Sequence, residues 1–305
     1  MGPDTTRVSA ERRARLMRLA SYASISVALT LVAAKAGAWG LSGSVSLLAS
    51  LADSALDVLA SLLNLVAVHH SLAPADREHR FGHGKAEALA GLAQALFVAA
   101  SAAFVLVEST RRLVDPQVPA ALDAGVAVMV FSMLLTSALL LFQRHVVRVT
   151  GSVAISADAL HFRVDLLVNA SVILALLLAA AGMPVFDALF AVGIAVYILW
   201  SVRDIALRSI DHLMDRELPD ADRKRIKAIV AEHPRVCGLH DLRSRRAGNS
   251  VFIQLHLELD DELSLLQAHQ ISDDVEAAVV AAYPGAEVII HTDPLSVVAI
   301  ETGAG

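Results

Sequence analysis

Charged side chains are scarce in this 305-residue chain, and their scarcity limits the class of protein to which it can belong. Asp, Glu, Lys and Arg make up 18% of the residues and hydrophobic residues 56%. An ordinary soluble domain carries roughly 25% charged residues. The mean hydropathy is +0.59. This composition excludes a typical soluble enzyme, and we predict an α-helical membrane protein.

Cysteine and clustered basic residues are also missing. The single cysteine, Cys237, excludes an internal disulfide framework and any metal site built from several thiolates. Residues 1–210 hold 16 basic and 14 acidic side chains, whereas residues 211–305 hold 9 and 17. The acidic C-terminal third argues against nucleic acid as a partner, because phosphate binding needs concentrated Lys and Arg.

Two catalytic motifs are absent as well. The chain contains no HExxH sequence, which argues against an intramembrane zinc protease. The run from Gly82 to Lys85 has neither the spacing nor the hydroxyl residue of a phosphate-binding loop. We therefore expect no organic cofactor and no nucleotide-driven step.

Long apolar runs, in contrast, are abundant. A helix needs roughly 20 apolar residues to cross a bilayer, and six runs in residues 19–210 meet that need. Arg and Lys gather in the N-terminal segment 1–18 and in the loops expected on the same side, which predicts that both termini are cytosolic. The predicted spans are 19–40, 45–70, 86–107, 120–142, 153–181 and 185–207.

Residues 211–305 form a separate soluble domain by their pattern. We predict a charged helix at 221–232, strands at 240–246 and 250–258 joined by a turn that includes Asn249, a helix at 264–282 and a strand at 287–291. This order predicts a small α+β sandwich with its helices on one face of the sheet.

Ionisable residues inside two of the spans are the strongest functional signal. Asp53 and Asp57 are four residues apart in one span, and His161 and Asp165 in another. Residues at this spacing share a helix face. An uncompensated carboxylate at bilayer depth costs on the order of 3 kcal/mol. Three carboxylates and one imidazole suit a tetrahedral divalent ion, zinc above all.

A second group lies in the loop after the second span. Asp76, His79 and His83 could form a three-ligand site closed by water. Histidines in a polar loop are also commonly just solvated, and the sequence leaves both interpretations open.

A third group lies in the soluble domain. In 252–258 apolar residues alternate with polar ones, so His256 faces away from the apolar stripe. Imidazoles from separate strands that converge with a carboxylate would form one or two zinc sites; the alternative is an open polar sheet face. The candidates are His240, His256, His269, His291 and Asp293.

Together these segments resemble the cation diffusion facilitator family, and most closely its bacterial zinc and ferrous-iron efflux pumps. The resemblance covers nearly the whole chain. Its most specific pieces are LADSALDVLASLLN, PADREHRFGHGKAE, SADALHFRVDLLVNA, LMDRELPD, HDLRSRRAG, FIQLHLE, QAHQISDDVE and IIHTDP.

The resemblance implies a role for each group. It implies a homodimer, a ferredoxin-like, metallochaperone-like cytosolic domain, and a charge pair of Lys85 and Asp215 near the dimer interface. Arg77 and Glu78 depart from the family pattern around the loop site. The implied sites are Asp53, Asp57, His161 and Asp165 for transport, Asp76, His79 and His83 in the loop, and a two-metal cluster of His240, His256, His291 and Asp293 with His269 beside it.

We therefore expect a transporter of the bacterial cytoplasmic membrane that exports Zn²⁺ in exchange for protons. Cd²⁺, Fe²⁺ and Mn²⁺ are further candidate substrates, because an oxygen-rich site admits them. Mg²⁺ and Ca²⁺ prefer six or more oxygen ligands and are disfavoured. A membrane metal sensor, or a metal-gated channel without proton coupling, is the alternative.

Overall fold

The computed structural model describes residues 10–42, 45–114, 123–180, 183, 185–248 and 250–301. The chain divides into two compact units, Met1–Ile210 and Asp211–Gly305.

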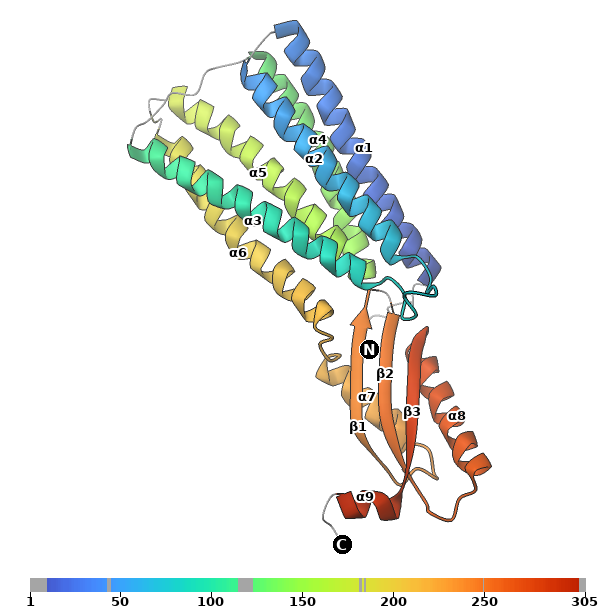
Figure 1. Ribbon diagram of the computed structural model, residues 1–305. Coiled ribbons are helices and arrows are strands. Elements are labelled where there is room, and N and C mark those ends of the chain that lie inside the picture. The colour runs from blue at the N-terminus through green and yellow to red at the C-terminus, as the bar shows by residue number, and fades with distance from the viewer. Residues whose placement is uncertain are drawn as a thin grey trace, which may run out of the picture. The chain divides into compact units, whose positions relative to one another are not determined.

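The first unit is a bundle of long helices that run alongside one another (Figure 1). Each has 27 residues or more, which at 1.5 Å per residue gives about 40 Å and exceeds the hydrocarbon thickness. The helices are α1 (Ala10–Ser42), α2 (Val45–Ser71), α3 (Lys85–Val114), α4 (Asp123–Thr150), α5 (Val153–Ala180) and α6 (Val185–Leu213).

All six predicted spans are helical over their described residues, and every one of these helices except α5 extends past its apolar run at one end or both. The first helix, α1, begins at Ala10 and so includes four basic residues that precede the first run, Arg12, Arg13, Arg15 and Arg18. The fourth helix continues to Thr150 and the sixth to Leu213. Hydropathy detects only the apolar part of a helix, so polar end turns escape it. Residues 120–122 and 181 of the predicted spans lie outside the described residues.

By length and apolar composition, five helices of the described part could cross a membrane, one each in α1, α2, α3, α4 and α6. The remaining helix, α5, is equally long but carries Asp158, Arg163 and Asp165 in its first half.

The α5 helix packs against most of its neighbours. Val153, Ala157 and Leu160 join an apolar cluster with α3 and α6. Ile155 packs with residues of α1, α2 and α4, and Phe162 with α1 and α4. Asp158 and His161 of α5 are therefore buried among the helices over this stretch, whereas Arg163 is exposed.

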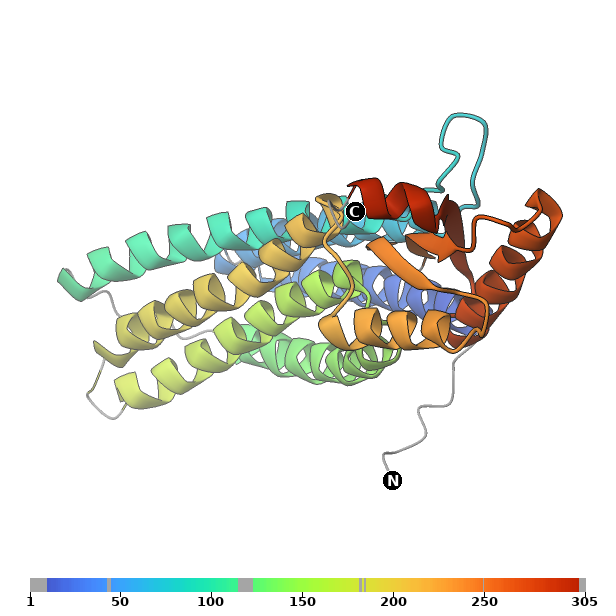
Figure 2. The ribbon, with the colours of Figure 1, turned by 90° about the horizontal axis from the view of Figure 1, so that it is seen from below.

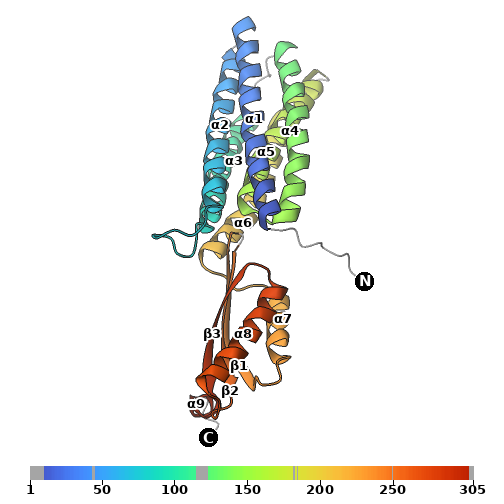
Figure 3. The same cartoon turned by 90° about the vertical axis from the view of Figure 1, so that its right-hand side faces the viewer.

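The second unit is a three-stranded sheet with helices on one face, as predicted. Figure 3 shows the sheet with α7 and α8 on the same side. The strand order is β1-β2-β3, with β1 and β2 antiparallel and β2 and β3 parallel. The elements are α7 (Asp220–Ala231), β1 (Gly238–Ala247), β2 (Ser250–Leu259), α8 (Leu265–Ala282), β3 (Ala286–Pro294) and α9 (Leu295–Glu301).

Alternation along β2 separates the two faces of this sheet. Ile253, Leu255 and Leu257 are buried against Ile271 and Val275 of α8. Side chains point to opposite faces at successive positions of a strand, so Gln254, His256 and Glu258 lie on the face that α7 and α8 leave open. The predicted turn residue Asn249 lies outside the described residues, and the short helix α9 was not predicted.

Candidate metal centres

The first centre lies between α2 and α5. His161 Nε2 is 3.0 Å from Asp57 Oδ1 and 3.7 Å from Asp165 Oδ2. Asp57 and His161 retain only 9% and 5% exposure. One ligand atom from each of the three lies within 4.8 Å of the others, a spacing that could hold an ion. We call these three residues the membrane trio.

Asp53, the fourth predicted ligand, is not in this group. It lies one turn before Asp57 on α2, and its side chain is exposed. One helical turn displaces it by about 5.4 Å along the axis. The structure thus brings together three of the four predicted transport-site residues.

Lys35 lies close to Asp53 and was not among the predicted site residues. Its Nζ donates to Ser54 Oγ at 2.6 Å and to the Ser50 carbonyl oxygen at 3.2 Å, so α1 places a cation against α2. An ionisable residue within a span is itself a functional signal, and that signal could have identified Lys35.

The second centre is the loop between α2 and α3, which extends away from the helices (Figure 2). Asp76 Oδ1 is 3.4 Å from His79 Nδ1, and Asp76 Oδ2 is 3.2 Å from His83 Nε2. The three predicted residues therefore converge. The ring centroid of His70, which was not among the predicted site residues, lies 4.4 Å from that of His83.

Backbone hydrogen bonds hold Asp76 in place. Its Oδ1 accepts the backbone N–H of His79 at 2.6 Å and that of Glu78 at 2.9 Å. Donation by the His79 amide is the largest cause that lowers the pKa of Asp76 below its ordinary value, with the Glu78 amide adding to it. The carboxylate is therefore ionised and available as a ligand at acidic pH.

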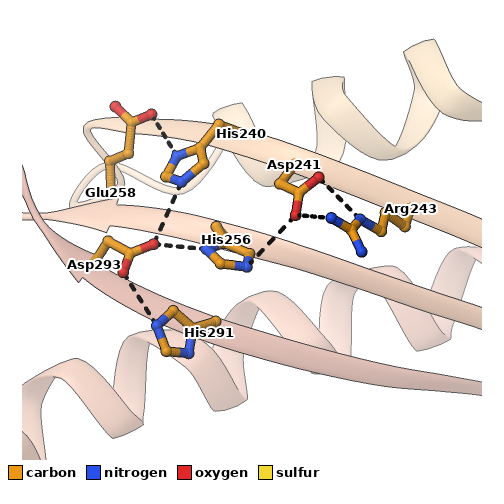
Figure 4. A network of polar contacts seen from close by, with 7 residues as sticks. All are labelled: His240, Asp241, Arg243, His256, Glu258, His291 and Asp293. Atoms are coloured by element: carbon orange, nitrogen blue, oxygen red, sulfur yellow. Dashed lines mark hydrogen bonds and ion pairs between the residues drawn. The ribbon is translucent and has the colours of Figure 1, made fainter. Parts of the chain in front are cut away.

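The third centre is the open face of the sheet in the second unit (Figure 4). His240 of β1 pairs with His256 of β2, which pairs with His291 of β3. Three histidines thus lie side by side across the strands, with ring centroids 5.0 Å and 4.7 Å apart. Strand register, which the sequence does not reveal, creates this row.

Asp293 connects the row. Its Oδ2 lies 2.8 Å from His256 Nδ1 and 3.4 Å from His240 Nε2, while its Oδ1 lies 3.1 Å from His291 Nε2 (Figure 4). His240, His256 and Asp293 could hold an ion. Glu258, which we did not predict, adds a carboxylate oxygen 3.0 Å from His240 Nδ1.

His269 does not belong to this cluster within one chain. It lies on α8, which packs against the opposite face of the sheet, and its side chain is 67% exposed. Its Nε2 is 3.6 Å from Asp273 Oδ2 on the same helix. The prediction missed this because it treated the tail histidines as one group without their placement on two faces.

The structure places the two members of the predicted charge pair in different units. Lys85 begins α3. Asp215 follows α6 in a left-handed backbone conformation with φ of 55°, and its Oδ1 is 3.3 Å from Arg245 Nη1.

A helical membrane unit with buried metal-ligand residues, joined to a small domain with a second ligand cluster, defines a membrane protein that handles metal cations. Residues 21–214 match the family described as cation efflux transmembrane domain, and residues 218–295 match the cation efflux protein cytoplasmic domain. The chain belongs to the cation efflux family, the cation diffusion facilitators that its sequence resembles.

Curated relatives match over most of their length. The cation-efflux pump FieF of Pectobacterium carotovorum is 47% identical over 93% of this chain and 95% of the relative. FieF of Shewanella oneidensis is 50% identical over 92% of this chain and 95% of the relative. A solved structure of CzrB in its Zn form is 34% identical, covers 27% of this chain and 94% of that chain, and has a TM-score of 0.26.

Proposed function

We propose that this protein exports Zn²⁺ from the cytoplasm in exchange for protons, with the cation bound at the membrane trio. The observation that supports this is the convergence of Asp57, His161 and Asp165 inside a bundle of apolar helices. The relatives named as cation-efflux pumps support the direction of transport.

The ligand chemistry favours zinc. Two carboxylates and one imidazole match the oxygen and nitrogen ligands of tetrahedral zinc sites. Asp53, one turn away on α2, would complete the set of four when its carboxylate turns toward the ion. Cd²⁺, Fe²⁺ and Mn²⁺ remain candidate substrates, since oxygen-rich sites also accept them.

The same residues explain exchange with protons. A bound ion requires a neutral His161 and ionised carboxylates, so binding releases protons and protonation releases the ion. Protons that arrive from a more acidic exterior would compete with the ion for the same lone pairs of His161 and the carboxylates. Exposure of one site to the two sides in turn then couples the fluxes without nucleotide.

The cluster of the second unit would serve regulation. Asp293 directs one oxygen to His240 and His256 and the other to His291, which suits a carboxylate that bridges two ions. Metal there would neutralise clustered acidic charge and favour a compact homodimer. In such a dimer, His269 would reach a cluster only from the partner, because within one chain it lies on the wrong face.

We place both termini on the cytosolic side of the bacterial inner membrane, from the distribution of Arg and Lys. The loop centre and the second unit would then sample cytosolic metal. The charge pair of Lys85 and Asp215 is proposed to stabilise the dimer near the membrane surface.

Zinc uptake into liposomes that contain the purified protein tests the proposal. Uptake should follow an imposed pH gradient and vanish in Asp165→Ala, while Asp273→Ala, a carboxylate removed from α8, should transport normally. Uptake that ignores the gradient would favour a channel, and the absence of uptake in the wild-type protein would favour a sensor. Uptake that persists in Asp165→Ala would move the site elsewhere.

A further inference from the structure

A fully buried carboxyl group, Asp158 of α5, lies outside every centre described above. Its exposure is 0%. Its Oδ2 contacts Ser24 Oγ of α1 at 2.5 Å and Gln143 Nε2 of α4 at 2.8 Å. Its Oδ1 has no hydrogen-bond partner in the described part of the chain. Three helices therefore meet at one carboxyl group.

The side chains of Ser24 and Gln143 carry too few hydrogens to make every hydrogen bond around Asp158 if its carboxyl is ionised. Besides the two contacts to Asp158, Gln143 Nε2 lies 2.9 Å from Ser24 Oγ, and Ser24 Oγ lies 3.0 Å from the Ala20 carbonyl oxygen. Ser24 supplies one hydrogen and the Gln143 amide two, so three hydrogens face four contacts. A proton on Asp158 Oδ2 would donate to Ser24 Oγ and complete the set, because Ser24 could then donate to Ala20.

The surroundings of Asp158 also favour its protonated, neutral form. No cation forms an ion pair with Asp158 among the residues that the structure describes. Of the groups that interact with it, Ser24 from α1 and Gln143 from α4 carry no charge, and His161 of α5 is the titratable one. Apolar residues of the neighbouring turns, including Ile155 and Phe162, are fully buried. An ionised oxygen would be left unpartnered there, at a high cost in free energy.

We propose that Asp158 is a proton-binding site of the transporter, separate from the cation ligands, whose proton is released when a cation occupies the membrane trio. Asp158 precedes His161 by three residues, so the two share a helix face one turn apart. A divalent ion at His161 stabilises the ionised carboxylate, and the O–H bond of Asp158 breaks with its proton passing to solvent. This inference rests on the proposed function, since it requires a cation at the trio.

The proton balance of zinc binding tests the inference. Zinc is added to full-length protein in detergent and weak buffer, and protons released and zinc bound are both counted. Asp158→Asn keeps the shape and polarity of the neutral acid but cannot lose a proton. On zinc binding, the Asp158→Asn variant should release about one proton fewer per protein than the wild type. In an Asp57→Ala background, where no ion binds nearby, adding Asp158→Asn should not change the number of protons released.

The inference would be overturned if Asp158→Asn released as many protons as the wild type. It would also be overturned if Asp158→Asn decreased proton release equally in the wild-type and Asp57→Ala backgrounds. The proposed function fails separately, if Asp57→Ala binds as much zinc as the wild type. Infrared difference spectra give a second reading that needs no change at Asp158. The zinc-sensitive band of a protonated carboxyl should shift in Gln143→Ala, and an unshifted band would contradict the assignment.

Discussion

At the scale of single residues, each candidate centre includes a carboxylate that neighbouring groups contact. Asp76 is fixed by two backbone amides, and Asp293 lies between histidines of all three strands. Asp57 contacts His161 directly. Local spacing predicted His161 and Asp165, which are four apart and share a helix face, but it also included Asp53, which lies outside the group. It could not predict the contacts of Asp158 with Ser24 and Gln143, which are far apart in the sequence.

The loop centre should lose zinc as the pH falls, because protons compete with the ion for the same ligand atoms. Asp76 should be the ligand that resists acid, since the hydrogen bonds from the backbone amides lower the pKa of its carboxyl below the ordinary value. The stabilisation from its amide bonds is present above the unfolded pKa and is lost only as the pH falls through the lowered folded value. Zinc titrations against pH, in a variant with Asp57→Ala and His256→Ala, would measure this. A zinc affinity that does not change with pH would contradict it.

In the second unit, His256→Ala should weaken zinc binding by about tenfold or more, as expected when a group that organises a metal site is lost. His256 contacts Asp293 and neighbours the rings of both His240 and His291. His233→Ala is the matched control, because His233 pairs with Asp274 on α8. Competition with a fluorescent zinc indicator gives the zinc affinities of both variants. Equal affinities would show that His256 is not a ligand of this site.

At the scale of elements, the apolar runs predicted all six long helices, and alternation predicted the two-faced sheet. The prediction could not supply the register that aligns His240, His256 and His291, because strand pairing depends on contacts distant in sequence. The close contacts between helices could not be predicted for the same reason. A β-carbon on Gly91 of α3 would lie 2.8 Å from Val153 Cγ1 and 2.9 Å from Ser209 Oγ.

Gly91→Ala should therefore force α3 away from α5 and α6. Overpacking of this kind costs about 1–3 kcal/mol of unfolding free energy. Gly193→Ala on α6 is the control, because nothing lies within 4 Å of its added β-carbon. Thermal unfolding in detergent should show a lower midpoint for the first variant and an unchanged or raised one for the second. Equal midpoints would mean that the α3 contact is not tight.

At the scale of the whole molecule, the chain joins a membrane unit to a small domain that has its own apolar core. A metal that binds only the folded domain stabilises it by mass action. Zinc at 100 times its dissociation constant should add about 2.7 kcal/mol. Unfolding of the second unit, followed with zinc, with magnesium and after chelation, should show this gain for zinc alone. The same gain in a His240→Ala and Asp293→Ala variant would contradict the assignment.

The membrane trio of Asp57, His161 and Asp165 is the proposed binding site of the transported cation. X-ray absorption at the zinc edge tests it most directly, in full-length protein whose other centres are removed by His83→Ala, His256→Ala and Asp293→Ala. We expect one bound zinc with a four-coordinate shell of oxygen and one imidazole nitrogen at about 2.0–2.1 Å, and we expect it to be lost in His161→Ala. A six-coordinate water shell, or a spectrum unchanged by His161→Ala, would contradict it.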